Sequence, residues 1–282
     1  MKTGLVLEGG GLRSLFSAGV MDVLMENGVR FDGIVGVSAG ATFGCNYKSH
    51  QEGRALRYNL RFKDDPRYMG FRSLLRTGDL VGAEFSYHIM PQQLDVFDVE
   101  TFQRDPAEFH VVCTDVLTGE PVYHRIDSVD DKELDWIRAS ASMPLVSRPV
   151  SLDGHLLLVG GISDSIPLRF FQRLGFERNV VILTQPKGYF KRRTKLMPLF
   201  HLFMRRYPAV VRAMSLRHLM YNEELSYLAV QERLGNVLTV CPQVKLPIGR
   251  TELNEKKMRH VYAMGRAEGE RLLPQIRAWM KG

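Results

Sequence analysis

The residues best suited to chemistry lie in the pentapeptide Gly36-Val37-Ser38-Ala39-Gly40. It follows an apolar run that predicts a strand and precedes a segment with a helical pattern. A G-x-S-x-G sequence in this context is typical of a nucleophile elbow, where a sharp turn exposes the serine hydroxyl. Gly36 and Gly40 leave room beside the serine, and the helix N-terminus favours negative charge developing there. The spacing predicts Ser38 as a nucleophile; a plain turn that needs small residues is the alternative.

A second glycine-rich segment, residues 9–14, follows the short apolar run 5–7 near the start of the chain. A strand that opens into three glycines and then a helix forms a nest of backbone N–H groups that suits an anion. A dinucleotide-binding loop needs G-x-G-x-x-G and a later acidic residue, and a P-loop needs G-K-[ST]; neither pattern is present. We therefore interpret this loop as an oxyanion hole beside Ser38. Its residues are Gly9, Gly10, Gly11, Leu12 and Arg13.

With these two segments the chain resembles the bacterial patatin-like phospholipases. The family's G-G-G-x-[KR]-G loop is matched except that Ser14 replaces the last glycine, the elbow is matched in full, and residues 139–144 match the family's A-S-x-x-x-P element. The resemblance covers about residues 3–185, and less clearly the remainder. It implies an α/β fold with a central, mostly parallel sheet flanked by helices, a variant of a hydrolase fold. It also implies acyl hydrolysis of lipids by a serine–aspartate pair without histidine, metal or cofactor.

The resemblance fails at the position of the catalytic aspartate. In the family this residue begins a D-G-[GA] motif after a hairpin strand, and the matching residues here are Val159-Gly160-Gly161. A valine cannot accept a proton, and a serine hydroxyl without an adjacent base is a weak nucleophile. The resemblance therefore implies a lipid acyl hydrolase scaffold, with Ser38 and the oxyanion hole intact, that is weakly active or inactive. A non-catalytic lipid- or membrane-binding protein on the same fold is the alternative.

Other titratable residues are poor substitutes for the missing base. Asp153 lies at the far end of the predicted hairpin, about 20 Å from Val159 at the usual rise of a strand. Asp164 is closer, and we interpret it as an N-terminal helix cap rather than a base. The sequence has eight histidines, none in a motif that places it near Ser38. Four of them are interpreted as surface or strand-end residues: His50, His110, His124 and His155.

Hydrophobic periodicity predicts alternating strands and helices. Strands are predicted over residues 3–7, 33–37, 109–114, 122–124, 149–152, 155–159, 179–184 and 236–241. Helices are predicted over residues 13–27, 39–49, 52–62, 131–141, 166–174, 208–233 and 254–280. This order favours a parallel sheet with the glycine loop and Ser38 at the C-terminal ends of its strands. The irregular residues 51–107 either cover the crevice as a lid or pack on the sheet.

The net charge of +7 is concentrated in one segment. Residues 186–222 contain nine lysines or arginines and no acid, interleaved at the start with aromatic side chains. Two interpretations stay open: residues 187–217 contact an anionic membrane surface, or they form a solvated helical face whose apolar side packs on the core. No nucleic-acid motif accompanies the charge, so no nucleic-acid partner is expected. We predict one patatin-like domain over 1–282, with its core at about 3–185 and helices from 223 packed on it.

The remaining composition points to a cytoplasmic protein. Cys45, Cys113 and Cys241 lack metal or redox spacing, which favours a reducing compartment. The N-terminal apolar run is too short for a signal peptide, and no stretch approaches the length of a membrane span. We expect a protein without metal or cofactor that acts on a lipid or ester substrate, with peripheral membrane contact left open.

Overall fold

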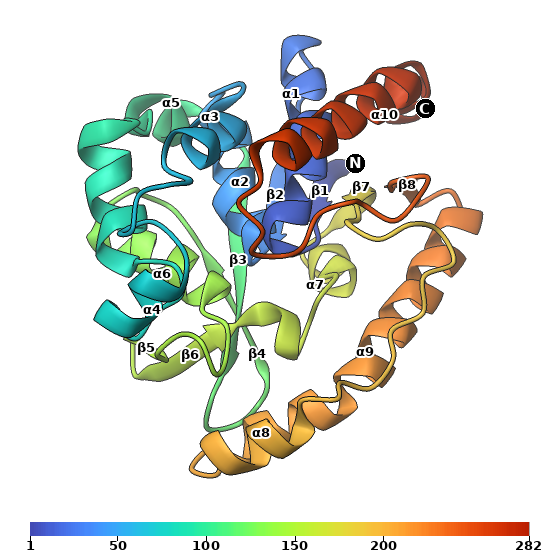
Figure 1. Ribbon diagram of the computed structural model, residues 1–282. Helices are drawn as coiled ribbons and strands as arrows, with labels where there is room; N and C mark the ends of the chain where they lie inside the picture. Colours follow the sequence, from blue (N-terminus) through green and yellow to red (C-terminus); the bar gives the residue numbers. More distant parts are fainter. Residues whose placement is uncertain (282) are drawn as a thin grey trace.

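The computed structural model describes residues 1–281, which form one eight-stranded sheet covered by helices (Figure 1). The strands are β1 (Lys2–Leu7), β2 (Gly33–Val37), β3 (Glu108–Asp115), β4 (Pro121–Arg125), β5 (Val150–Leu152), β6 (His155–Val159), β7 (Phe176–Ile182) and β8 (Val237–Val240). Successive hydrogen-bonded neighbours are β5-β6-β3-β2-β1-β7-β8. Strand β3 pairs with β4 along one edge and with β2 and then β6, end to end, along the other. Strands β1, β2, β3, β7 and β8 run parallel, while β4 and β6 run antiparallel to β3. The predicted α/β fold with a mostly parallel sheet is confirmed.

Helices lie on both faces of the sheet because its central strands are apolar on both faces. The helical elements are η1 (Gly11–Ser14), α1 (Leu15–Glu26), α2 (Ala39–Lys48), α3 (Arg54–Arg61), α4 (Phe71–Thr77), η2 (Phe85–Leu94), α5 (Val99–Arg104), α6 (Asp131–Ala141), η3 (Gly160–Ile162), α7 (Leu168–Arg173), α8 (Met197–Phe203), α9 (Pro208–Arg233) and α10 (Glu255–Lys281). In β1, Leu5 and Leu7 pack in the cluster that contains α1, α2 and α10 residues. Val6 points the other way, toward Phe171 of α7 and Tyr221 of α9.

The order in which strands are added to the sheet reverses direction at β1. Strand β1 pairs with β2 on one edge and with β7 on the other, so β2 and β3 extend the sheet one way and β7 and β8 the other. Ligands of parallel α/β sheets bind at the carboxyl ends of the strands beside such a switch point. The glycine loop follows β1 and Ser38 follows β2, so both lie at this position.

Residues 51–107 pack on the core rather than stand away from it. They contain α3, α4, α5 and η2, a π-helix with Pro91 inside it. Tyr58, Phe85 and Phe102 are buried in the same cluster as Phe109 of β3. The interpretation as a packed insertion is therefore confirmed, and its relation to the crevice is described below.

The last helix is held tightly against the first. A Cβ atom on Gly265 of α10 would lie 2.0 Å from the carbonyl oxygen of Phe16, and one on Gly19 of α1 would lie 2.2 Å from that of Tyr262. Glycine at both positions lets the two backbones approach, and Figure 1 shows α10 crossing α1. Within residues 1–281, no helix is both long and apolar enough to cross a membrane.

Candidate active site

Ser38 occupies a strained corner between β2 and α2. Its φ of 57° and ψ of −123° lie in a region that non-glycine residues rarely adopt, as expected at a nucleophile elbow. A Cβ atom on Gly36 would lie 2.6 Å from the Ala41 backbone, and one on Gly40 would lie 2.5 Å from the Leu7 carbonyl oxygen. The two glycines are therefore required by close contacts on both sides of the serine.

Ser140 fixes the elbow from the end of α6. The Ser38 N–H donates to Ser140 Oγ at 3.0 Å, and Ser140 Oγ donates to the Val112 carbonyl at 2.6 Å. Ser140 is fully buried. This chain of hydrogen bonds links β3, α6 and the elbow, and it gives a structural reason for the A-S-x-x-x-P element over residues 139–144.

The glycine loop lies directly against the elbow. A Cβ atom on Gly9 would lie 2.9 Å from Ser38 Cβ, so only glycine permits this approach. Among residues 1–281, the N–H groups of Gly9, Gly10 and Gly11 have no hydrogen-bond acceptor, which leaves them available to an oxyanion. The expectation for Leu12 needs a correction, because its N–H donates to the Arg250 carbonyl at 2.8 Å.

The sheet register places Val159 beside the elbow. Residues 110–112 of β3 pair with β2 and β4, and residues 113–114 pair with β6 and β4. Strands β2 and β6 therefore share one edge of β3, with Val37 opposite Val112 and Val159 opposite Cys113. Val159 thus follows directly beyond the end of β2. In the part of the chain that the structure describes, no group accepts a hydrogen bond from Ser38 Oγ.

The other carboxylates are occupied elsewhere. Asp153 sits in the hairpin turn and pairs with Lys132 at 2.7 Å. Asp164 is not a helix cap, contrary to the sequence-based interpretation, because α7 begins after Pro167. It is buried and accepts a hydrogen bond from Tyr123 Oη at 2.7 Å. Burial raises the pKa of Asp164, and burial together with the charge of Asp164 raises the pKa of its neighbour Glu224.

The histidines also lie away from Ser38. His50, His124 and His155 are bonded to acidic side chains outside the crevice, at Asp105, Glu133 and Asp115. His110 corrects the sequence-based interpretation: it lies inside β3, is only 6% exposed, and burial lowers its pKa. A strand covered on both faces explains this burial. Within residues 1–281, no cluster of His, Cys, Asp and Glu side chains is arranged to hold a metal ion.

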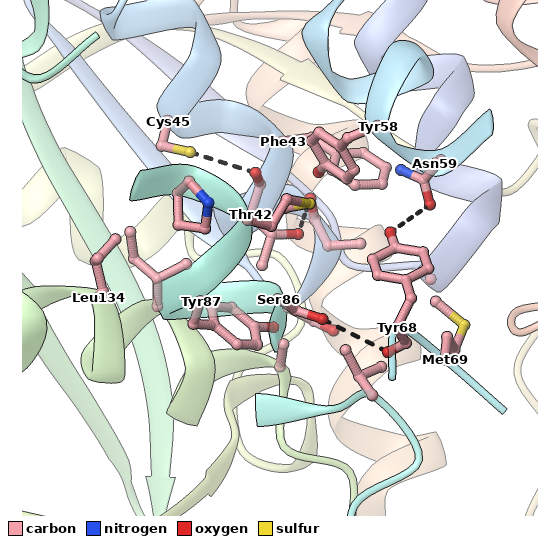
Figure 2. Close-up of a pocket in the computed structure, with 18 of the residues that line it drawn as sticks. Thr42, Phe43, Cys45, Tyr58, Asn59, Tyr68, Met69, Ser86, Tyr87 and Leu134 are labelled. Carbon is pink, nitrogen blue, oxygen red and sulfur yellow. Dashed lines mark hydrogen bonds between the residues drawn. The ribbon is translucent and has the colours of Figure 1, made fainter. Parts of the chain in front are cut away.

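An apolar cavity of about 130 Å³ opens beside Ser38 and runs along α2, past Thr42 and Cys45 (Figure 2). The segment 51–107 builds most of the opposite wall, so this insertion also covers the crevice. Figure 2 shows Tyr58, Tyr68 and Tyr87 around the space, with Tyr68 Oη donating to Asn59. This wall, which the sequence did not predict in detail, supplies a lining suited to a hydrocarbon chain.

A second, larger cavity of about 460 Å³ opens on the other side of the elbow. Ser38, Gly11, Met143 and Arg250 line both cavities, so the serine lies where they meet. The second cavity is also lined by Val159, the glycine loop and five basic side chains: Arg13, Lys191, Arg192, Arg217 and Arg250. Among the described residues, Glu8 is the one acid lining either cavity, and its carboxylate binds Thr184 and Tyr221 rather than Ser38.

Comparisons with known proteins point to one family. Residues 5–171 match the family model described as Patatin-like phospholipase, and residues 207–281 match a domain of unknown function, DUF6363. Uncharacterized protein YjjU of Escherichia coli is 31% identical over 269 residues, 93% of this chain and 70% of that protein. Lysophospholipase nte1 of Aspergillus oryzae is 29% identical over 177 residues, 61% of this chain but only 11% of that protein. The crystal structure of VipD from Legionella pneumophila aligns with 97% of this chain and 67% of its own at 13% identity, with a TM-score of 0.47.

Proposed function

Because this chain belongs to the patatin-like phospholipase family, we propose that it is a lipid acyl hydrolase scaffold whose nucleophile is Ser38. The observation that carries the proposal is the position of Ser38, which stands at a strained elbow, against the free N–H groups of Gly9–Gly11, where an apolar cavity meets a polar one. An ester whose acyl chain fills the apolar cavity places its carbonyl carbon next to Ser38 Oγ.

The proposed reaction proceeds in two steps. Ser38 Oγ attacks the ester carbonyl carbon, and the glycine N–H groups hold the negative oxygen of the tetrahedral intermediate. The ester C–O bond then breaks, the alcohol leaves with a proton, and an acyl-serine remains. Water attacks the acyl-serine and releases the fatty acid and the free Ser38. Each step needs a base for the attacking hydroxyl, and Val159 cannot supply one.

This chain is therefore proposed to turn over slowly or not at all. Catalytic groups that remain after loss of a triad member retain about 10³–10⁴-fold acceleration over water. The second candidate function is lipid binding without turnover, which the loss of the base at position 159 favours. Both candidates use the same cavities, and they differ in whether Ser38 still forms a covalent bond.

A fluorophosphonate probe separates these two candidates. We expect an alkyl fluorophosphonate to label this chain once, at Ser38, because the elbow and the glycine N–H groups still stabilise the phosphonylated serine. Peptide mass spectrometry locates the adduct, and a Ser38→Ala variant is the control that must remain unlabelled. Absence of labelling at high probe concentration would support the second candidate, lipid binding without turnover.

We also propose that the protein acts at an anionic membrane surface, on the cytoplasmic side, where its three cysteines stay reduced. Helix α8 exposes Leu199, Leu202 and Phe203, whereas its residue Phe200 is buried and lines the second cavity. Exposed basic residues flank the helix at positions 192, 193, 195, 205 and 206. Apolar side chains beside positive charge suit the interface of anionic lipids. A lipid leaving such a surface at α8 enters the second cavity directly.

Replacing Leu202 and Phe203 by serine should weaken binding to vesicles of phosphatidylcholine and phosphatidylglycerol about tenfold or more, since each buried side chain contributes roughly 1.5–3 kcal/mol at most. Co-sedimentation measures the bound fraction. The matched control replaces Leu234 and Val244, which are similarly exposed but lie at the far end of α9 and after β8, away from α8, and should bind as this chain does. Equal binding by both variants would remove α8 from the membrane contact.

A further inference from the structure

Besides the exposed Arg192, four basic side chains converge on the second cavity from separate parts of the chain. Arg13 belongs to η1, Lys191 follows β7, Arg217 belongs to α9, and Arg250 precedes α10. All four line the same space as Ser38 and the glycine loop. Only Arg13 was expected near the site from the sequence, because the other three lie beyond the residues that match the family model.

These charges are only partly offset within the protein. In the part of the chain that the structure describes, no carboxylate lies within salt-bridge distance of any of the four. The one acid that lines the cavity, Glu8, accepts hydrogen bonds from the Thr184 backbone N–H at 2.7 Å and from Tyr221 Oη at 2.6 Å. The cavity therefore holds an excess of positive charge next to the candidate nucleophile.

Two of these cations are fixed in place, Lys191 as a buried residue and Arg217 as a half-buried one. Lys191 is only 8% exposed, and its Nζ lies 3.8 Å from the centre of the Tyr221 ring. Its backbone N–H donates to Asn222 Oδ1 at 2.8 Å, and its carbonyl accepts from Asn222 Nδ2 at 2.9 Å. Arg217 Nε donates to the Gly161 carbonyl. Glu8 is one negative charge among several positive ones, and burying charge without enough counter-ions is costly. This rigid placement therefore favours a ligand that supplies further negative charge.

The protonation behaviour of the cluster agrees with this interpretation. Burial, followed by repulsion from Arg217, lowers the pKa of Lys191 to about 7. Burial and the charge of Arg250 lower the pKa of Arg217 to about 10. Arg13 has its Nε buried without an acceptor, and its pKa is lowered as well. The cations thus destabilise one another in the absence of an anion.

We propose that Arg13, Lys191, Arg217 and Arg250 form a subsite for the phosphate of an ester lipid whose acyl chain occupies the apolar cavity. The inference rests on the proposed function and assigns the residues that recognise the phosphate, three of them outside the part of the chain that matches the family model. Such a subsite favours a phospholipid or lysophospholipid over a neutral acylglycerol. Phosphate oxygens accept several charge-assisted hydrogen bonds at once, which suits guanidinium and ammonium groups converging from different directions. Ser38, between the two cavities, then faces the ester bond that joins the two parts of such a lipid.

The test compares two substrates with the same acyl chain, lysophosphatidylglycerol and monoacylglycerol, of which only the first carries a phosphoglycerol headgroup. Both kcat/KM values are measured in a Val159→Asp background and expressed as a ratio. General damage to the elbow lowers both values equally and leaves this ratio unchanged. We expect this ratio to favour the phospholipid and to fall at least about 30-fold when Lys191→Met and Arg250→Gln are added, since two charge-assisted hydrogen bonds are lost. The matched control carries Lys256→Met and Arg72→Gln, at exposed positions outside both cavities, and should keep the ratio.

Calorimetry on this chain itself tests the subsite without turnover, so failure of the proposed reaction and failure of the subsite remain distinguishable. Lysophosphatidylglycerol should bind more tightly than monoacylglycerol, and Lys191→Met with Arg250→Gln should remove that preference. Inorganic phosphate should compete with the phospholipid. Binding of phosphate without any preference between the lipids would instead identify a site for the free anion and overturn the headgroup assignment. A preference for the phospholipid that survives in the double variant would also overturn it.

The preference should also depend on pH. Lys191 faces Glu8, Arg13, Tyr189, Arg217, Tyr221 and Arg250. Because its pKa is about 7, Lys191 is charged below pH 7 and loses its proton above pH 7. A phosphodiester keeps one negative charge over this whole range. The kcat/KM ratio should therefore fall about tenfold between about pH 6 and about pH 8, since one linked proton is lost. The Lys191→Met variant should show a flat ratio, and the same decrease in that variant would assign the titration to another group.

Discussion

The Val159→Asp variant should hydrolyse p-nitrophenyl esters about 10²–10⁴-fold faster than this chain, the usual contribution of a positioned general base. The reason is geometric. Strands β2 and β6 share one edge of β3, so residue 159 follows directly beyond the strand that ends at Val37. An aspartate there faces the same cavity as Ser38 and can take the proton of its hydroxyl. Initial rates with a short-chain ester measure the gain.

Two further variants identify the origin of that gain. Val159→Asn has nearly the shape of aspartate but cannot accept the proton, so it should stay close to this chain. Adding Ser38→Ala to Val159→Asp should remove the gained activity. If this chain is already as active as the Val159→Asp variant, residue 159 is not the missing base, and Asp164 becomes the position to test.

Cys45→Phe, in the Val159→Asp background, should change the preferred acyl length by about 10²-fold. Cys45 lies seven residues after Ser38 on α2, which corresponds to about 10 Å of helix, and both residues line the apolar cavity. A phenyl ring at this depth blocks long acyl chains but leaves room for short ones. Each methylene kept out of the cavity loses roughly 0.8 kcal/mol of transfer free energy, so about four methylenes account for the expected effect.

The ratio of kcat/KM for p-nitrophenyl decanoate and butyrate measures this change. Activity on the butyrate ester in the same variant shows that the fold and the elbow survive the larger side chain. The matched control is Cys241→Phe, which introduces the same ring at a cysteine outside both cavities. An unchanged ratio in Cys45→Phe would place the acyl chain somewhere other than this cavity.

The frame of the fold could be predicted from the sequence because its signals are local. The apolar run of β1 leads into the glycine loop and that of β2 into the elbow, and α6 and α9 have the predicted bounds of 131–141 and 208–233. The elbow was predictable for the same reason, since Gly36, Ser38 and Gly40 lie within five residues. Position 159 was assigned by resemblance, and the register of β6 on β3 now gives a physical reason for it.

The side chains around Ser38 were harder to predict because the fold brings them together from distant positions. Lys191 and Arg217 belong to a segment whose charge suggested only a surface, yet Lys191 is buried beside Tyr221. The wall of the apolar cavity contains a π-helix around Pro91, which no simple period describes. Asp164 resembled a cap because Pro167 follows it, whereas burial beside Tyr123 decides its environment. Each of these features depends on tertiary contacts, so local patterns could not reveal it.

The most direct test of the account is to follow both products of lysophosphatidylglycerol hydrolysis by the Val159→Asp variant in water labelled with ¹⁸O. Attack by Ser38 on the acyl carbon, followed by water, predicts that the fatty acid gains ¹⁸O in its carboxyl group and that the glycerophosphodiester gains none. The variant that also carries Ser38→Ala should release neither product. Label in the phosphate-containing product, or fatty acid release without Ser38, would contradict the assignment of Ser38 as the nucleophile of a lipid acyl hydrolase.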